Sequence, residues 1–286
     1  MLIPPSILLI VMGPVMGVPV TDLFAAAIVP GLMLAVLYIS YTLIRSAINP
    51  SLGPPLTAEE SDVTWRKKLY ELVVGVFPVA IVIGATLGFI LAGITTPTDA
   101  AATGGFAALI LALAYRRLTW SQFKVAVYRT TITTAFIMFL LVSANFFGAV
   151  FSRLGSDHVL TEFLLNLPLT GTWMLLLMLA IVFVLGSPLE WIPIVLVVVP
   201  IFMPTVVQLG IDPLWFAILV AVTLQTSWLT PPMALSSYFL KGVVPSWKMG
   251  DIYAGQLQFI VLQLIVVGLL VAFPGIVHWL PSVLDY

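Results

Sequence analysis

The chain is built mainly from long apolar segments that are separated by short polar connectors. An α-helix rises about 1.5 Å per residue, so a segment of about 20 apolar residues crosses the roughly 30 Å hydrocarbon core of a bilayer. The pattern therefore predicts an all-α fold, that of a polytopic transmembrane helical protein. The apolar segments cover residues 7–20, 26–45, 69–93, 98–115, 131–151, 171–186, 191–207, 214–228, 233–245 and 256–277.

The segments between residues 190 and 245 are shorter and contain several prolines. A proline removes one backbone N–H donor, and irregular backbone at membrane depth is tolerated only where protein or a water-filled cavity satisfies it. These segments are therefore predicted to form re-entrant hairpins and discontinuous helices rather than plain spans. The prolines concerned are Pro200, Pro204, Pro213, Pro231, Pro232 and Pro245.

Two polar connectors, residues 46–68 and 116–129, hold most of the basic residues. With Arg45 they carry eight of the eleven Lys and Arg side chains, one at position 45, three at 66–68 and four at 116–129. The positive-inside rule predicts that both connectors are cytoplasmic. The segments 69–93 and 98–115 then cross the membrane outward and back, with a turn at residues 94–97.

Two stretches of the chain share one order of features: a Pro-Pro pair, a short apolar stretch, a Gly-to-Pro run and an acidic residue. Paired halves with breaks at matching places are typical of secondary transporters, so we predict an inverted-repeat ion-transporter architecture. The first copy contains Ile3-Pro4-Pro5, Gly17-Val18-Pro19 and Asp22, and the second contains Thr230-Pro231-Pro232, Gly242-Val243-Val244-Pro245 and Asp251, at separations of 225 to 229 residues.

The two copies differ in what precedes them. About 45 residues of hairpin-like sequence, 186–229, precede the second copy, whereas the first copy begins at residue 3. We therefore expect the chain to be truncated at its N-terminus. The predicted regions are 1–45, the end of the first repeat with a hairpin remnant and a transmembrane helix; 46–68, a cytoplasmic connector; 69–185, transmembrane helices with a Thr-Pro-Thr-Asp break and an interfacial amphipathic helix at 119–129; and 186–286, the second hairpin, the Thr-Pro-Pro break and a C-terminal transmembrane helix.

The composition supports a membrane protein and excludes several other classes. Hydrophobic residues make up 61% of the chain and charged residues 8%, against roughly 25% charged residues in soluble domains. The formal net charge of −1 leaves no basic surface for nucleic acid. The absence of cysteine excludes disulfides and thiolate metal sites, and the two histidines, His158 and His278, lack the spacing of a transition-metal site.

The first polar motif that could carry chemistry runs from Gly93 to Ala101. Thr96 has the character of a helix N-cap, Pro97 suits the first helical position, and Asp99 falls in the first turn, at the positive end of the helix dipole. One interpretation is a well-capped turn. The other is a functional site, because acidic groups at membrane depth are costly and usually functional. Its hydroxyls, carbonyls and carboxylate are hard oxygen ligands that suit Na⁺ or a proton.

The second motif is Thr223-Leu-Gln225-Thr226-Ser227-Trp228-Leu229-Thr230-Pro231-Pro232. Its two consecutive prolines remove two N–H donors, so the upstream carbonyls need another partner. A bound cation is one such partner and water is another. The alternative is a kinked helix whose hydroxyls bond its own backbone. Ser6, in the matching break at residues 2–6, is the predicted counterpart in the first repeat.

Other polar residues have simpler interpretations. Glu190 fits the base of a hairpin, and Asp212 fits an N-cap that precedes Pro213. An intramembrane enzyme would need a nucleophile with a base, or paired carboxylates, within reach of one another. The serines have no His or Lys partner, and Asp99 and Glu190 lie in unrelated motifs, so the chain is predicted not to be an enzyme.

At these motifs the sequence resembles the large membrane subunit (DctM-like) of the tripartite ATP-independent periplasmic (TRAP) transporters. The residues around Leu224 and Phe151 are most similar to those of the family branch labelled mannitol/chloroaromatic transport. The matching stretches are Ile-Pro-Pro-Ser (3–6), Thr-Pro-Thr-Asp-Ala-Ala (96–101), Tyr-Arg-Arg-Leu-Thr-Trp (115–120), Gly-Ile-Asp-Pro-Leu-Trp-Phe (210–216) and Leu-Gln-Thr-Ser-Trp-Leu-Thr-Pro-Pro (224–232).

This resemblance implies a multi-pass, Na⁺-driven importer of small organic acids in a bacterial inner membrane, working by an elevator-type motion without a cofactor other than the coupling ion. It also implies two partners, a small four-helix membrane subunit and a periplasmic substrate-binding protein. The implied cation and substrate site comprises Ser6, Gly93, Thr96, Pro97, Thr98, Asp99, Gln225, Thr226, Thr230, Pro231 and Pro232, with Na⁺ near Thr96, Thr98, Thr226 and Thr230.

The sequence departs from the family pattern at three places and in length. Asp99 replaces the usual Glu, Thr223 replaces the usual Asn, and Met233-Ala-Leu-Ser-Ser replaces a Gly-containing run. The first third of the family's chain is absent. The alternative function is therefore a non-transporting truncated remnant, or half of a split carrier, that only assembles with partner subunits.

Overall fold

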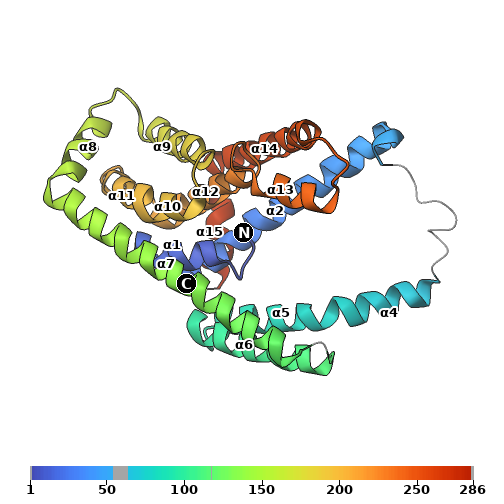
Figure 1. Cartoon of the computed structure of the whole chain (residues 1–286). Helices are drawn as coiled ribbons and strands as arrows, with labels where there is room; N and C mark the ends of the chain where they lie inside the picture. Colours follow the sequence, from blue (N-terminus) through green and yellow to red (C-terminus); the bar gives the residue numbers. More distant parts are fainter. Residues whose placement is uncertain (1, 54–63, 117, 285–286) are drawn as a thin grey trace. The chain divides into compact units, whose positions relative to one another are not determined.

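The structure is a computed structural model that describes residues 2–53, 64–116 and 118–284. Throughout these residues the regular secondary structure is helical, and six helices are long and apolar enough to cross a membrane. The predicted all-α, polytopic membrane fold is confirmed. The chain divides into two compact units: the first joins the residues up to Ala35 with those from Ile132 onward, and the second covers Val36–Thr131. Figure 1 shows the helices along the chain.

The first unit is organised around a short helix, α12 (Pro213–Leu224). All of its residues from Phe216 to Leu224 are buried, because the helix is apolar on every side and neighbours cover it all round. Figure 1 shows α12 among these neighbours. The helices that pack against it are α1 (Ile7–Met16), α9 (Gly171–Gly186), α11 (Val199–Gln208), α14 (Met249–Ala272) and α15 (Gly275–Val283).

The two copies of the predicted repeat fold into the same order of elements. Each begins with a Pro-Pro pair joined by a cis peptide bond. A short helix follows, α1 in the first copy and α13 (Leu235–Val243) in the second. Each copy then has a break and a long helix with an acidic residue in its first turn: α2 (Val20–Ile48) with Asp22, and α14 with Asp251. The internal repeat therefore exists in the structure as well as in the residue order.

The expectation that prolines break the segment 191–207 is wrong. Trp191–Gln208 is one helical run of 18 residues, long enough to span a membrane. It consists of α10 (Trp191–Pro193), the π-helical turn η2 (Ile194–Val198) and α11. The wider π turn ends two residues before Pro200, which cannot donate a backbone hydrogen bond, so the helix changes its hydrogen-bond pattern near the proline instead of ending.

The second unit contains two packed arms at the segments that are predicted to cross the membrane outward and back. Its first arm is α4 (Trp65–Gly75) with α5 (Phe77–Leu91), and its second arm is α6 (Pro97–Ala114), which packs against α5. The hydroxyl of Tyr115 donates a hydrogen bond to the carbonyl of Val74, which ties the end of the second arm to the end of α4 within the first arm. Before α4, the unit also contains the short helix η1 (Pro50–Leu52).

The predicted interfacial helix at residues 119–129 is not separate from the span that follows. Both belong to α7 (Trp120–Arg153), a single helix of 34 residues. No Gly or Pro lies near the expected boundary, and the hydroxyls of Thr130 and Thr131 donate to the carbonyls of Ala126 and Val127, each at 2.9 Å. The helix therefore continues. The connector after α7 contains a further helix, α8 (Ser156–Leu165), that the hydrophobic pattern did not predict.

The membrane orientation of the second unit can be tested directly because the chain contains no cysteine. We expect a single cysteine at Ile94, which is 66% exposed, to react with an impermeant maleimide in right-side-out spheroplasts. Cysteines at Lys67 and Lys124 should react only in inverted vesicles, because the basic connectors are predicted to be cytoplasmic. Equal labelling of all three positions from one side would contradict the outward-and-back pair.

Candidate functional site

The Thr-Pro-Pro motif interrupts the helices at the end of the buried core helix. α12 ends at Leu224, the 3₁₀ segment η3 (Gln225–Trp228) follows, and α13 begins only at Leu235. The predicted break at residues 230–232 is confirmed. Asp212 caps the other end of α12, where its carboxylate accepts a hydrogen bond from the N–H of Trp215 at 2.7 Å. The core helix is therefore fixed at its start and opens into irregular backbone at its end.

Four hydroxyls in this region bond to carbonyl groups one turn earlier, the geometry of the kinked-helix interpretation. Each hydroxyl that donates its hydrogen still has lone pairs that can accept a hydrogen bond or coordinate a cation. The oxygens therefore remain usable as hard ligands. The pairs are Thr223 with Leu219 at 2.8 Å, Thr226 with Thr223 at 2.6 Å, Ser227 with Leu224 at 2.6 Å, and Thr230 with Thr226 at 2.9 Å.

The C-terminal end of α9 lies against one side of the break. The Ser187 hydroxyl donates to the carbonyl of Pro231. A Cβ atom placed on Gly186 would lie 3.3 Å from the Cβ of Ser227, tighter than most such contacts. A larger residue at position 186 would therefore push against the polar segment. Gly186 permits the close approach of α9 to η3.

Two buried glutamines of α14 bond to the segments on either side of the break. The Gln256 amide forms hydrogen bonds with the hydroxyls of Ser236 and Ser237, at the start of α13. The Gln263 amide nitrogen donates to the carbonyl of Val222, near the end of α12, at 3.1 Å. The two glutamines are seven residues apart, about two helical turns, so they lie on one face of α14. This face fixes both flanks of the break.

The first-repeat residue predicted for the site lies in the same unit. Ser6 is buried and accepts a hydrogen bond from the N–H of Leu9 at 3.5 Å, which makes it the N-cap of α1. Because α1 packs against α12, Ser6 and the Thr-Pro-Pro break belong to helices that share the core helix. The structure therefore brings Ser6 and residues 225–232 into one compact unit.

The Thr-Pro-Thr-Asp motif lies in the second unit and forms the predicted cap. The Asp99 N–H donates to the Thr96 hydroxyl at 3.2 Å, and this hydroxyl donates to the Asp99 carboxylate at 2.7 Å. Pro97 occupies the first turn of α6, and Gly93 adopts the positive φ of 68° that the preceding turn requires. Thr96, Thr98 and Asp99 are exposed, so their oxygens are accessible.

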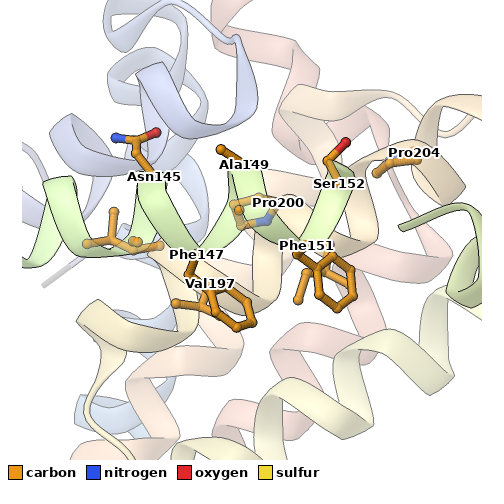
Figure 2. Close-up of a pocket in the computed structure, with 12 residues that line it drawn as sticks. Asn145, Phe147, Ala149, Phe151, Ser152, Val197, Pro200 and Pro204 are labelled. Atoms are coloured by element: carbon orange, nitrogen blue, oxygen red, sulfur yellow. The ribbon is translucent and has the colours of Figure 1, made fainter. Parts of the chain in front are cut away.

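A recess of about 430 Å³ lies away from these predicted residues, between α7 and the helical run from Leu196 to Pro204. Figure 2 shows Phe147 and Phe151 at this recess together with Val197, Pro200 and Pro204. The two phenylalanine rings stack with centroids 5.7 Å apart. The Asn145 amide, also at the recess, donates to its own helix at Leu141, at 3.0 Å. This apolar lining fits hydrocarbon better than an ion. The hydrophobic pattern gave no sign of the recess.

The chain matches one family over nearly its whole length. The family model described as "Tripartite ATP-independent periplasmic transporter, DctM component" matches residues 1–276. The chain is 28% identical to the C4-dicarboxylate TRAP transporter large permease protein DctM of Pseudomonas aeruginosa, over 98% of this chain and 64% of that protein. It is 29% identical to the sialic acid TRAP transporter large permease protein SiaM of Vibrio cholerae, again over 98% and 64%.

A third relative is the C4-dicarboxylate TRAP transporter large permease protein DctM of Rhodobacter capsulatus, to which the chain is 30% identical over 87% of its own length and 58% of the relative's. The chain thus spans less than two thirds of the length of these three curated relatives. None of their names refers to mannitol or chloroaromatic compounds, so that branch stays a prediction.

The substitution Gln256→Leu tests how α14 supports the break. It leaves the hydroxyls of Ser236 and Ser237 without their amide partner, and we expect a loss of about 1–3 kcal/mol in the free energy of unfolding. SDS-induced unfolding in mixed micelles measures this loss. The matched control is Gln208→Leu, because Gln208 is exposed on α11. Equal effects of the two substitutions would contradict a supporting role for Gln256.

Proposed function

The chain belongs to the DctM family of tripartite ATP-independent periplasmic transporters, and from this premise we propose that it is the large permease subunit of a Na⁺-coupled importer of organic acids. The family is one of transporters, so the chain is a transport protein and not an enzyme. Because the chain spans less than two thirds of its relatives, the activity of the whole carrier is part of the proposal.

Two partners complete the proposed carrier, a small four-helix membrane subunit and a periplasmic substrate-binding protein in the envelope of a bacterium. The inner membrane is the proposed location. The chain is a multi-pass membrane protein, and its family is one of periplasmic transporters. An elevator-type motion requires one compact body to move past another, and the division of the chain into two compact units supports this.

The observation that carries the proposal is the broken helix at the end of α12. Its buried hydroxyls, Thr226 and Thr230, place hard oxygen atoms where the backbone is irregular and the surroundings are apolar. Broken helices of this kind coordinate coupling ions in other transporters. Within the second unit, Thr96 and Thr98 are the proposed Na⁺ ligands, with Asp99 supplying a negative charge.

The names of the relatives support an acidic substrate. The Pseudomonas aeruginosa protein is named for C4-dicarboxylates and the Vibrio cholerae protein for sialic acid. Importing an anion against a membrane potential that is negative inside costs about 2.3 kcal/mol per charge per 100 mV. Na⁺ that enters with the acid offsets this cost, which is the physical reason to couple the two.

The substitution Thr230→Val tests the Na⁺ site on the purified chain. It keeps the side-chain volume and removes one hydroxyl ligand. A ligand that binds the folded state stabilises it by RT ln(1 + [L]/Kd), about 1.4 kcal/mol at ten times Kd. We expect Na⁺, compared with K⁺ at equal ionic strength, to raise the midpoint of thermal unfolding, and Thr230→Val to raise the Na⁺ concentration for half of that effect.

The control for this experiment is Thr205→Val. Thr205 is a fully buried threonine of α11, outside the break, so its substitution should leave the Na⁺ response unchanged. An absence of Na⁺ stabilisation in the unsubstituted chain would contradict ion coupling and favour the non-transporting remnant. An unchanged half-saturation in Thr230→Val would remove Thr230 from the site.

The substitution Asp99→Asn tests whether the carboxylate acts on Na⁺ or only caps α6. Loss of the charge should raise the half-saturating Na⁺ concentration by about tenfold, equivalent to about 1.4 kcal/mol, in the same unfolding assay. Asp22→Asn is the matched control, because Asp22 is also an acidic residue in the first turn of a helix. A shift no larger than that of Asp22→Asn would mean that Asp99 is a cap alone.

A further inference from the structure

The 3₁₀ segment η3 carries two buried N–H groups that find no acceptor in the described part of the chain. They are the side-chain amide nitrogen of Gln225 and the indole nitrogen of Trp228. A buried donor without a partner loses its hydrogen bonds to water and gains none in return, which is unfavourable. Native structures keep few such groups, and each needs an explanation. Two of them in one turn of helix indicate that this turn receives an acceptor from outside the chain.

The register of η3 places the two donors on the same side. A 3₁₀ helix has three residues per turn, so residues i and i+3 lie above one another, and Gln225 and Trp228 have this spacing. The other two sides are closed: Thr226 is 0% and Ser227 3% exposed, and Gly186 of α9 lies close to Ser227. Gln225 and Trp228 are themselves only half-buried. Their side of η3 is therefore its least covered side, although the two donor nitrogens themselves are buried.

The distribution of charged residues determines which groups around the break can bind this ligand. No Lys or Arg occurs between Arg153 and Lys241, so the segments that form the hairpin and the break offer no cation to an arriving anion. Neutral N–H donors are what the break presents instead. Hydrogen bonds from such donors to a charged acceptor are shorter and roughly twice as strong as bonds between neutral groups. A carboxylate, with two oxygens that only accept hydrogen bonds, matches two N–H donors.

We propose that Gln225 and Trp228 form a neutral donor pair that binds one carboxylate group of the transported acid. This proposal rests on the proposed function, since it assigns the substrate class to residues of the same break. The amide nitrogen of Gln225 donates to the carboxylate, and so does the indole nitrogen of Trp228. Thr226 and Thr230, on the same stretch of backbone, present oxygen atoms for the cation. In this arrangement the N–H groups of the break bind the anion, and its oxygen atoms bind Na⁺.

Nuclear magnetic resonance of the indole groups tests this pair. The full chain, labelled with ¹⁵N in its tryptophan indoles, is titrated in detergent micelles with acetate, the minimal carboxylate, and separately with neutral acetamide, at constant Na⁺. Trp228→Phe assigns the signal of Trp228. We expect acetate, and not acetamide, to move the Trp228 N–H proton signal downfield in a saturable manner.

Two variants make the test specific. Trp215 is the internal control, because its indole nitrogen already donates to the carbonyl of Leu270 at 2.9 Å, and its signal should not move. Gln225→Met, which keeps the chain length and removes the amide, should raise the half-saturating acetate concentration at least about tenfold, the equivalent of about 1.4 kcal/mol for one hydrogen bond to a charged group.

Three results would overturn the pair: a Trp228 signal that does not respond to acetate, an equal response to acetamide, or a response unchanged in Gln225→Met. A shift of the Trp228 signal in Glu190→Gln without acetate would also overturn it, since the donors would then serve a carboxylate of the chain itself. The Na⁺ stabilisation measured on the same samples separates the two proposals. Na⁺ stabilisation without any acetate-dependent shift of the Trp228 signal refutes the donor pair alone. An acetate-dependent shift without Na⁺ stabilisation refutes ion coupling alone.

Discussion

Every backbone N–H and carbonyl group inside a membrane needs a partner within the protein, and this requirement governs how the chain ends its core helix. α12 is buried on all sides and then gives way to a 3₁₀ turn and two prolines that cannot donate. The chain meets the demand with side chains. Hydroxyls of the break bond to carbonyls one turn earlier, Ser187 bonds to Pro231, and the amide of Gln263 reaches Val222.

These hydrogen bonds hold the segments on both sides of the break. They leave two side-chain donors of the break itself without a partner among the described residues. α14 supports both sides through Gln256 and Gln263, while the buried donors on Gln225 and Trp228 have no acceptor among the described residues. The same order of Pro-Pro pair, short helix and long helix recurs at the start of the chain, where Ser6 caps α1 against the core helix. In the proposed binding site, this arrangement lets ligands leave without loss of the surrounding structure.

The sequence predicted what depends on local chemistry. The spans, the cap at Thr96, the cap at Asp212 and the break at Thr230–Pro232 follow from residue type and spacing along one segment, and the structure has them. The pattern did not predict where a helix continues through an expected break. It did not show that a π turn carries the helix past Pro200, or that α7 continues through residue 130.

The sequence pattern also did not predict the hydrogen-bond partners of the break. Gln263 and Val222 are 41 residues apart and Gln256 and Ser236 are 20 apart, so only the packing of α14 on α12 and α13 brings them together. Trp228 belongs to the predicted motif but was not among the predicted site residues, and nothing in the residue order distinguishes a satisfied indole such as that of Trp215 from an unsatisfied one. The sequence located the break, and the tertiary packing defines its donors and acceptors.

The broken end of α12 is proposed to belong to a specific Na⁺ site. Equilibrium binding of radioactive Na⁺ to the purified chain, in a buffer with K⁺ in large excess, tests this claim without any knowledge of the substrate. A specific Na⁺ site should give saturable binding that unlabelled Na⁺ displaces and K⁺ does not. Binding that never saturates, or that K⁺ displaces as well as Na⁺ does, would contradict it.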